Sequence, residues 1–293
     1  KAVAGGGGRG MRAVFEPVAV AEAYARCAAE ALAAFGVGDV YAEKLIPRAR
    51  HLEIQVLGDG TQVMALGERE CTLQRRFQKL VEIAPSPRLN PALREQLIGA
   101  ALTLARSSRY TGLGTFEFLV DDDSATLPFV FIEANPRLQV EHTVTEEVTG
   151  VDLVAAQIGV AAGRSLAALG LDALHPPPAR GFAVQWRINA EVQDAEGNAR
   201  PASGLITRCD LPTGPGVRVD THARADLMPS PHYDSLLAKL IVSHRGSFDE
   251  ALRRSQRALA ECRIAGLATN LPLLRALAAH EALHHHTVHT RWL

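Results

Sequence analysis

The sequence predicts an α+β protein, with a mixed or antiparallel sheet leading each half of the chain. Two strand-like segments, 50–60 and 62–69, meet at an Asp-Gly turn, which is the usual sign of a β-hairpin. Other segments place apolar residues at helical spacing, as 90–108 does with Pro91 in its first turn. Both kinds of element are therefore expected.

Turn and cap residues mark where these elements begin and end. Gly36 closes an alanine-rich helix, Ser247 opens an amphipathic one, and the acidic turn Asp121–Asp123 joins two adjacent strands. In chain order, the expected strands are 39–46, 50–60, 62–69, 112–120, 128–135, 182–191, 204–212, 216–222 and part of 231–244, and the expected helices are 18–36, 90–108, 144–163 and 247–264.

A proline-rich segment, 171–181, is the best candidate for a domain boundary, because prolines stiffen a connection. It divides the chain into domains 1–175 and 180–293. The chain starts at Lys1, directly before a glycine run, and has no initiator Met. We therefore expect it to be a piece of a longer protein.

The composition excludes several classes of protein. With 47% hydrophobic and 22% charged residues the chain is globular, and its net charge of -1 suggests neither a nucleic-acid partner nor an anionic membrane. The longest apolar run, 151–163, is too short to span a bilayer. The four cysteines are scattered, which favours reduced thiols in a cytoplasmic protein over a disulfide framework or a zinc site.

The segment 131–142 alternates strictly between apolar and polar residues. Its polar row is Glu133, Asn135, Arg137, Gln139 and Glu141. In an extended chain this row would share one face, which is either the wet side of a sheet or the floor of an active site. With Glu117 from the preceding strand, Glu133 and Asn135 would offer hard oxygen ligands suited to Mg²⁺ or Mn²⁺. The two interpretations are about equal on pattern alone.

Three other motifs have an ordinary explanation beside a functional one. The glycine run 5–8 with Arg9 would let backbone amides approach phosphate oxygens, but a flexible linker explains it about as well. The basic cluster within 68–79 is typical of an exposed face, and its Cys71 of a small packed residue. The histidine run 284–286 is expected to be solvated rather than metal-binding.

Taken together, these motifs resemble the biotin carboxylase family of ATP-grasp enzymes, through nearly the whole chain. The resemblance implies an ATP-grasp domain over 1–175, with a lid at about 1–45 and its upstream part missing, and a biotin carboxylase C-terminal α+β domain over 180–293. The segments that carry it are 1–11, 42–46, 50–60, 68–79, 114–120, 131–154, 186–191 and 233–242.

The resemblance also implies an activity. The family uses ATP and bicarbonate to carboxylate N1′ of biotin on a carrier domain, through carboxyphosphate, which releases CO₂ and phosphate. By motif, the nucleotide contacts implied are Lys1, Gly7, Gly8, Glu43, Lys44, Ile46, His51, Gln74, Glu117, Glu133 and, more weakly, His289. The implied ligands of two divalent cations, Mg²⁺ or Mn²⁺, are Glu117, Glu133 and Asn135.

A second implied pocket holds bicarbonate and biotin. Its residues would be Lys79, Arg137, Gln139, the amide of Val140, Glu141 and Arg187. Glu141 is implied as the base that removes the bicarbonate proton, and Arg187 as the residue that holds bicarbonate and stabilises the biotin enolate. Metals and cations would neutralise phosphoryl charge, and positioning would do most of the remaining work.

The chain departs from the family pattern in three places. Phe77 stands where the family has a histidine near the nucleotide phosphates, so ATP affinity is expected to be lowered. The family's N-terminal domain and an upstream ATP-binding lysine lie outside this chain, and Lys1 is at a chain end. A rival interpretation is therefore a truncated, catalytically inactive remnant that retains only nucleotide or partner binding.

The implied partners are a biotin carboxyl carrier domain or protein and a carboxyltransferase subunit or domain, and the complete protein is expected to form a homodimer. The same module serves carboxylases of different acceptors, from acetyl-CoA carboxylase in fatty acid biosynthesis to urea-carboxylating relatives. No biotin-carrying lysine motif and no carboxyltransferase segment occurs in this sequence.

Overall fold

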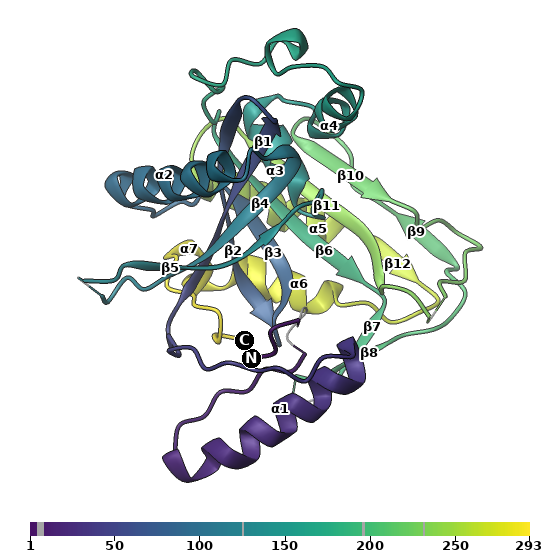
Figure 1. The fold of residues 1–293 in the computed structure, drawn as a ribbon. Coiled ribbons are helices and arrows are strands. Elements are labelled where there is room, and N and C mark those ends of the chain that lie inside the picture. The colour runs from purple at the N-terminus through teal and green to yellow at the C-terminus, as the bar shows by residue number, and fades with distance from the viewer. Residues whose placement is uncertain (5–8, 125, 195–196, 231) are drawn as a thin grey trace.

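The computed structural model describes residues 1–4, 9–124, 126–194, 197–230 and 232–293. Its centre is one eight-stranded sheet in the order β10-β11-β6-β3-β2-β1-β4-β5, with every neighbouring pair antiparallel (Figure 1). These strands are β1 (Arg50–Asp59), β2 (Val63–Arg75), β3 (Gln78–Ala84), β4 (Thr111–Val120), β5 (Phe129–Asn135), β6 (Phe182–Asn189), β10 (Val217–Thr221) and β11 (Leu236–His244).

Strands from both sides of the proline-rich segment belong to this one sheet. β3 pairs with β6, so that Val81 faces Trp186 and Ile83 faces Val184. The expectation of a separate sheet in each half therefore differs from the structure, which has one sheet built from both halves. Two short antiparallel pairs lie outside it: β7 (Glu191–Gln193) with β8 (Ala199–Pro201), and β9 (Arg208–Asp210) with the distant β12 (Arg263–Ala265).

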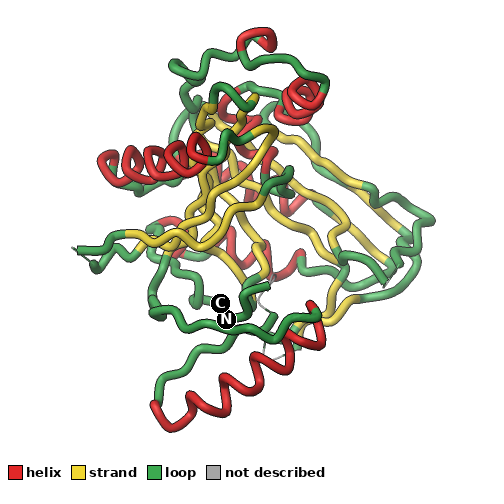
Figure 2. Tube along the Cα trace, in the orientation of Figure 1, coloured by secondary structure: helices red, strands yellow, loops and turns green. Residues whose placement is uncertain are grey.

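Helices cover both faces of this sheet (Figures 1 and 2). The helices of the chain are α1 (Val20–Phe35), α2 (Pro91–Ser107), α3 (His142–Thr149), α4 (Leu153–Ala161), α5 (Phe248–Glu261), α6 (Leu271–Ala279) and α7 (Glu281–His284), with 3₁₀ turns η1 (Pro17–Ala19) and η2 (Ala167–Leu169). Of these, α1 does not cover the sheet: it packs with η1 and lies below the sheet in Figure 1. Among the described residues, no helix has the length and apolar character needed to cross a membrane.

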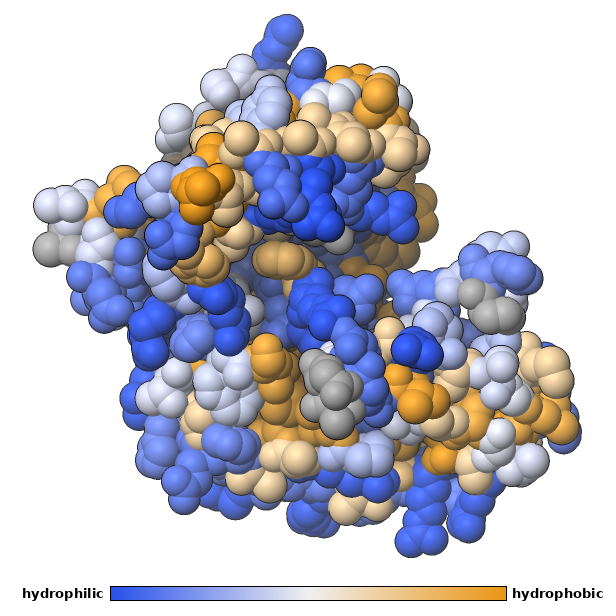
Figure 3. Space-filling model, turned by 90° about the horizontal axis from the view of Figure 1, so that it is seen from below, coloured by the Kyte–Doolittle hydropathy of each residue, from blue (hydrophilic) through white to orange (hydrophobic). Residues whose placement is uncertain are grey.

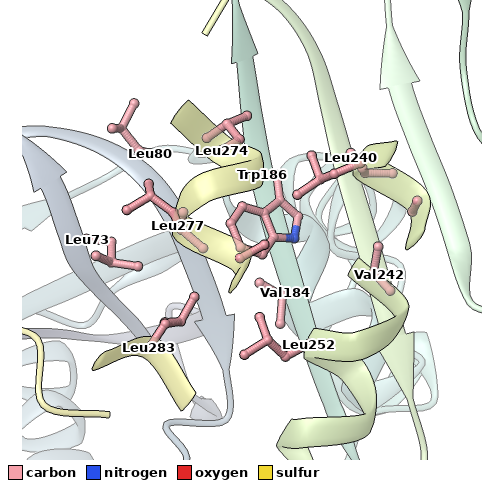
Figure 4. Close-up of a cluster of buried hydrophobic side chains, with 14 of the residues drawn as sticks. Leu73, Leu80, Val184, Trp186, Leu240, Val242, Leu252, Leu274, Leu277 and Leu283 are labelled. Atoms are coloured by element: carbon pink, nitrogen blue, oxygen red, sulfur yellow. The ribbon is translucent and has the colours of Figure 1, made fainter. Parts of the chain in front are cut away.

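One face of the sheet is apolar. Around Trp186 on β6, side chains of α5, α6 and β11 form a fully buried cluster (Figure 4). Farther along the same face, Leu52 and Ile54 of β1 pack with α2. Because side chains alternate along a strand, the intervening residues of β1 and β6 point to the opposite face, which α3 and α4 cover only in part. That second face carries the polar site.

Two expected elements differ from the structure. The segment 39–46 is not a strand: only Val40 forms an isolated bridge, to Ala2. It lacks a neighbouring strand to complete a ladder, and a strand without a partner leaves its backbone groups unsatisfied. The expected helix 144–163 is divided into α3 and α4 at Gly150, whose left-handed φ of 76° ends α3 as a cap.

The C-terminal histidine run also differs from expectation. His286 is buried, and its Nε2 lies 2.7 Å from the carboxylate of Glu70 on β2. Arg50 and Ser86 hold the same carboxylate, at 2.8 and 2.6 Å. Only His285 of the run is exposed. The solvated-run interpretation was therefore wrong for His286, which anchors the C-terminal segment to the sheet.

Candidate functional site

The polar face of the sheet gathers three carboxylates around one ammonium group. Glu53 on β1 and Glu117 on β4 are direct cross-strand neighbours, so their charges would repel. Lys79 on β3 prevents this, since its Nζ lies 2.6 Å from Glu53, 3.1 Å from Glu117 and 2.7 Å from Glu141. All three carboxylates are almost fully buried. Lys79 is thus the cation that these carboxylates of β1, β4 and the residue before α3 share, while Arg69 also pairs with Glu53 and Arg187 with Glu141.

Glu141 links this cluster to an arginine from beyond the proline-rich segment. Arg187 on β6 donates from Nη2 to Glu141 at 2.9 Å and from Nε to Glu82 at 2.5 Å. Gln185, two residues earlier on the same strand, donates to the other oxygen of Glu82 at 2.9 Å. Glu141 is therefore held between two cations, Lys79 and Arg187.

Glu117 has further neutral partners. His51 Nε2 lies 2.7 Å from one Glu117 oxygen, and Gln139 Nε2 donates to the other at 3.0 Å. Gln74 Nε2 approaches Nδ1 of His51 at 2.5 Å. An amide that donates to Nδ1 leaves the ring proton on Nε2, facing Glu117. Gln74 thus orients the His51 ring, and His51 in turn orients the carboxylate of Glu117.

Hard oxygen donors collect where the C-terminal end of β5 pairs with the interior of β4. Glu117 and Glu133 are cross-strand neighbours, and Asn135 Nδ2 donates to both, at 2.9 and 3.1 Å. Carboxylate and amide oxygens are the ligands that Mg²⁺ and Mn²⁺ prefer. Beside them, Gln139 Oε1 is buried without a hydrogen-bond partner among the described residues. The residues present therefore fit a divalent cation.

Electrostatics keep most of this cluster ionised. Burial opposes ionisation of Glu117, but the hydrogen bond from His51 and the charge of Lys79 outweigh it and lower its pKa. For Glu141, burial and the charge of Glu53 oppose ionisation, and Lys79 and Arg187 still hold the pKa below its usual value. The pKa of Lys79 is raised well above normal, because its carboxylate partners overcome burial.

Several residues of the cluster escaped the sequence interpretation. Arg69 is fully buried and donates to Glu53 at 2.5 Å, to Gln55 at 2.6 Å and to Thr145 of α3 at 2.9 Å. Glu82 was missed as well, and burial raises its pKa above the usual value. Part of this network could have been found from the sequence, because His51, Glu53 and Gln55 alternate with apolar residues along one predicted strand.

The alternating segment 131–142 is only partly a strand. β5 ends at Asn135, and its residues Ile132 and Ala134 are not buried, so the expected apolar core face is absent from this part of the structure. β5 is the edge strand of the sheet, which explains its exposure. Beyond Asn135 the chain turns, and Gln139 and Glu141 reach the site from a loop rather than from a strand face.

Arg137 lies apart from Lys79 and Arg187. Its guanidinium is exposed and contacts the carbonyl of Leu138 at 3.3 Å and Asn135 Oδ1 at 3.5 Å. Arg137 therefore lies beside Asn135, one of the oxygen donors suited to a metal ion, whereas Lys79 and Arg187 both contact Glu141.

The predicted nucleotide residues near the N-terminus form a separate group. Lys1 Nζ lies 3.6 Å from Glu43 and 5.8 Å from the ring centre of Tyr41. Lys44 is exposed and Ile46 is buried. Gly7 and Gly8 lie outside the described residues. The described residues show no contact between this group and the carboxylate cluster.

The C-terminal segment reaches back to this N-terminal region. Thr290 donates its backbone N–H to the carbonyl of Ala49 at 2.8 Å, and the Arg291 guanidinium lies over the ring of Phe15 at 5.4 Å. His289 is half-buried, and burial together with Arg48 lowers its pKa. Seen from below, the surface of the molecule has a hollow that both hydrophilic and apolar side chains border (Figure 3).

Phe77 stands at the tip of the β2–β3 hairpin. Arg75 pairs with Gln78, so Arg76 and Phe77 form a two-residue turn, and both have positive φ, 48° and 68°. Such turns favour Asn and Gly, and a bulky residue in this region is strained. The Phe77 ring is 60% exposed. The hairpin places it two residues before Lys79.

Family models match both parts of the chain. Residues 1–169 match the model described as carbamoyl-phosphate synthase L chain, ATP binding domain, and residues 185–293 match the biotin carboxylase C-terminal domain. A curated biotin carboxylase from Nostoc is 48% identical over 274 residues, which is 92% of this chain.

The chain belongs to the biotin carboxylase family.

Solved biotin carboxylases share its fold along the whole chain. The β,γ-ATP complex from Campylobacter jejuni is 38% identical, with a TM-score of 0.92. The biotin carboxylase domain dimer of the Hydrogenobacter thermophilus 2-oxoglutarate carboxylase, in complex with MgADP, ADP and bicarbonate, is 40% identical, with a TM-score of 0.93. Each covers 100% of this chain. The ATP-grasp architecture expected from the sequence is confirmed.

The chain corresponds to part of each of these biotin carboxylase relatives. It spans 59% of the Nostoc protein and 63% of each of the two solved chains. A pyruvate carboxylase from Pichia angusta is 46% identical over 284 residues, which is only 23% of its length. The region thus recurs inside larger carboxylases.

Proposed function

We propose that this chain is part of a biotin carboxylase, which uses ATP and bicarbonate to carboxylate biotin on a carrier domain through carboxyphosphate. The observation that carries the proposal is the position of Glu141. This carboxylate lies between Lys79 at 2.7 Å and Arg187 at 2.9 Å, beside the metal-type donor Glu117. A base flanked by two cations suits a small anion that must be bound and deprotonated.

Nucleotide phosphates would be held where the C-terminal end of β5 pairs with β4. Glu117, Glu133 and Asn135 would bind two divalent cations, which neutralise phosphoryl charge when bound. His51 and Gln74 would contact the nucleotide, as would Lys1, Gly7, Gly8, Glu43, Lys44, Ile46 and His289 around the lid at about 1–45.

Bicarbonate would bind where Lys79 and Arg187 now share the carboxylate of Glu141. An anion placed there can take over part of the hydrogen bonding of both cations, which frees a Glu141 oxygen to accept the bicarbonate proton. Gln139, the amide of Val140 and Arg137 would complete the pocket. Attack on the γ-phosphoryl group would then give carboxyphosphate.

Arg187 would serve the second half of the reaction. Carboxyphosphate divides into CO₂ and phosphate, and the phosphate removes the N1′ proton of biotin. Arg187 donates from both ends of its guanidinium, to Glu82 and Glu141, so its position is fixed before substrate arrives. A fixed cation can stabilise the developing enolate oxygen without reorganisation.

We also propose a role for each part of the chain. Residues 1–175 would form the ATP-grasp part and 180–293 the C-terminal domain, a division supported by the ranges of the two family models. A carboxyl carrier and a carboxyltransferase would be the partners, and the complete protein a cytoplasmic homodimer. Similarity to pyruvate carboxylase and to an acyl-CoA carboxylase subunit leaves the choice of acceptor to the transferase.

The test uses the full-length protein from which this chain comes, with free biotin as substrate. We expect ATP hydrolysis that requires both bicarbonate and biotin, and a fall of about a hundredfold or more in kcat for Glu141→Gln, as for loss of a general base. Calorimetry with MgATP provides a second readout. Absence of bicarbonate-dependent hydrolysis, or an unchanged rate in Glu141→Gln, would overturn the proposal. Heat of MgATP binding without bicarbonate-dependent hydrolysis would favour the inactive remnant that retains only nucleotide binding.

A further inference from the structure

Lys239 on β11 is a nearly buried lysine that the proposed reaction leaves without a role. Its side chain is 12% exposed, and its Nζ has two partners in the described structure, the carbonyl of Val140 at 3.2 Å and the carboxylate of Asp220 at 3.1 Å. A buried ammonium group is costly unless it is paired, and Asp220 supplies the opposite charge. The bond to Val140 is not needed for that neutralisation.

The carbonyl of Val140 belongs to the peptide group that joins Val140 to Glu141. Glu141 is the N-cap residue of α3, and its side chain makes no capping hydrogen bond because it points to Lys79 and Arg187 instead. The bond from Lys239 fixes the orientation of this peptide, and with it the direction in which the Glu141 side chain leaves the loop.

Sheet register places Lys239 beside the same pocket. Lys239 and Arg187 are direct cross-strand partners on β11 and β6, so their side chains lie on one face. Asp220, the partner of Lys239, also accepts from Arg218 at 2.9 Å, and Arg218 donates to Glu146 of α3 at 2.8 Å. Strands β10 and β11 thus hold α3 at Val140, before its first residue, and again at Glu146.

We propose that Lys239 is a positioning residue, whose ammonium group holds the Val140–Glu141 peptide so that the Glu141 carboxylate lies between Lys79 and Arg187. The inference rests on the proposed function of Glu141. It predicts that Lys239 acts on the bicarbonate step and leaves MgATP binding alone, because its contacts end at the loop before α3 and do not reach Glu133 or Asn135.

The experiment measures bicarbonate-dependent ATP hydrolysis by the full-length protein and its Lys239→Met variant, which keeps the length of the side chain and removes the donor. We expect kcat/KM for bicarbonate to fall about tenfold to a hundredfold, as for loss of a hydrogen bond from a charged group. KM for MgATP should change less than about twofold.

Two controls separate positioning from a structural role. Asp220→Asn removes the ion pair but keeps the Val140 bond, so its kcat/KM for bicarbonate should stay within about threefold of the wild type. Lys239→Cys treated with 2-bromoethylamine restores an ammonium group of nearly the same length, and should recover most of the lost activity. The treated wild type corrects for reaction at Cys209, which is only half-buried.

The outcomes are distinct. A wild type without bicarbonate-dependent hydrolysis would overturn the proposed function and this inference with it. An active wild type whose Lys239→Met variant keeps its kcat/KM for bicarbonate would overturn only the inference. So would equal losses in Lys239→Met and Asp220→Asn, or a loss that aminoethylation does not reverse, since these would assign Lys239 to strand stability alone.

Discussion

At the scale of single residues, Lys79 contacts more carboxylates of the site than any other described side chain does. It is the shared partner of Glu53, Glu117 and Glu141, which come from three separate segments of the chain. Lys79→Met would remove the cation that the three buried carboxylates share, although Arg69 would still pair with Glu53 and Arg187 with Glu141. We expect the variant to lose about 3–5 kcal/mol of unfolding free energy in urea, as when one partner of a buried ion pair is removed.

The double variant Lys79→Met/Glu53→Gln provides the check, because it removes a negative charge along with the cation. It should be more stable than Lys79→Met alone. If the two variants are equally stable, the buried carboxylates of Lys79→Met take up protons instead of staying charged and repelling one another.

His286 gives a second prediction at this scale. Its Nε2 contacts Glu70 at 2.7 Å, and Nδ1 is buried without a partner among the described residues. His286→Leu should destabilise the protein by about 3–5 kcal/mol in urea unfolding, because Glu70 loses a buried partner. The adjacent His285 is exposed, so His285→Leu is the matched control and should change stability by less than about 0.5 kcal/mol. Similar effects of both variants would contradict the assigned anchor.

Some of these residues could be predicted from the sequence and others could not. Glu117, Glu133, Asn135 and Glu141 were expected together, and they do converge. His286 was misjudged because a run of histidines carries no periodicity, and only the folded chain shows which of them meets Glu70. Arg69 was missed because a buried arginine is unusual, and its partners Glu53 and Thr145 are distant in sequence.

At the scale of elements, local signals predicted most helices and strands well. Ser247 forms the predicted cap of α5, with Glu250 completing a capping box, and the Asp-Gly turn joins β1 to β2. The errors have different causes. Gly150 is a local helix stop that divides one expected helix, whereas 39–46 lacks a strand to pair with. Strand β3 was not among the expected strands, so its pairing with β6 was not predicted either.

The β2–β3 hairpin gives the prediction at this scale. Arg76 and Phe77 both occupy the left-handed region, where Asn is better tolerated than a bulky side chain. Phe77→Asn should therefore raise the unfolding free energy by about 0.5–1 kcal/mol, measured by urea unfolding. Phe77→Leu keeps an apolar side chain and the strain, and should give no gain. A destabilised Phe77→Asn would show that the ring contributes packing that outweighs the strain.

At the scale of the whole molecule, the buried carboxylates set the response to acid. The pKa values of Glu53, Glu117 and Glu141 are lowered because nearby cations or hydrogen-bond donors outweigh burial, and that of Glu70 is lowered by His286 and Arg50. Groups with lowered pKa contribute stability that is complete above the unfolded value of about 4.5 and is lost as the pH falls toward the folded value.

Urea unfolding between about pH 7 and pH 3 should therefore show a midpoint that falls below about pH 4.5. Glu82 acts in the opposite sense, since its raised pKa favours the folded state as it takes up a proton, but it is one group against four. Glu70→Gln should flatten the acid limb, because it removes one of the four. A midpoint independent of pH in this range would contradict the assigned charges.

The pairing of β3 with β6 limits how this protein can be rearranged. Lys79 and Arg187 meet at Glu141 only because these two strands lie side by side, with the proline-rich segment between them in the chain. Consider a chimaera with its first half from one relative and its second half from another. Its β3 and β6 would have to pair correctly before Lys79 and Arg187 could both reach Glu141. Exchange of parts would therefore first fail at the pairing of β3 with β6 inside the sheet, and not at the stiff proline-rich segment where the sequence suggests a domain boundary.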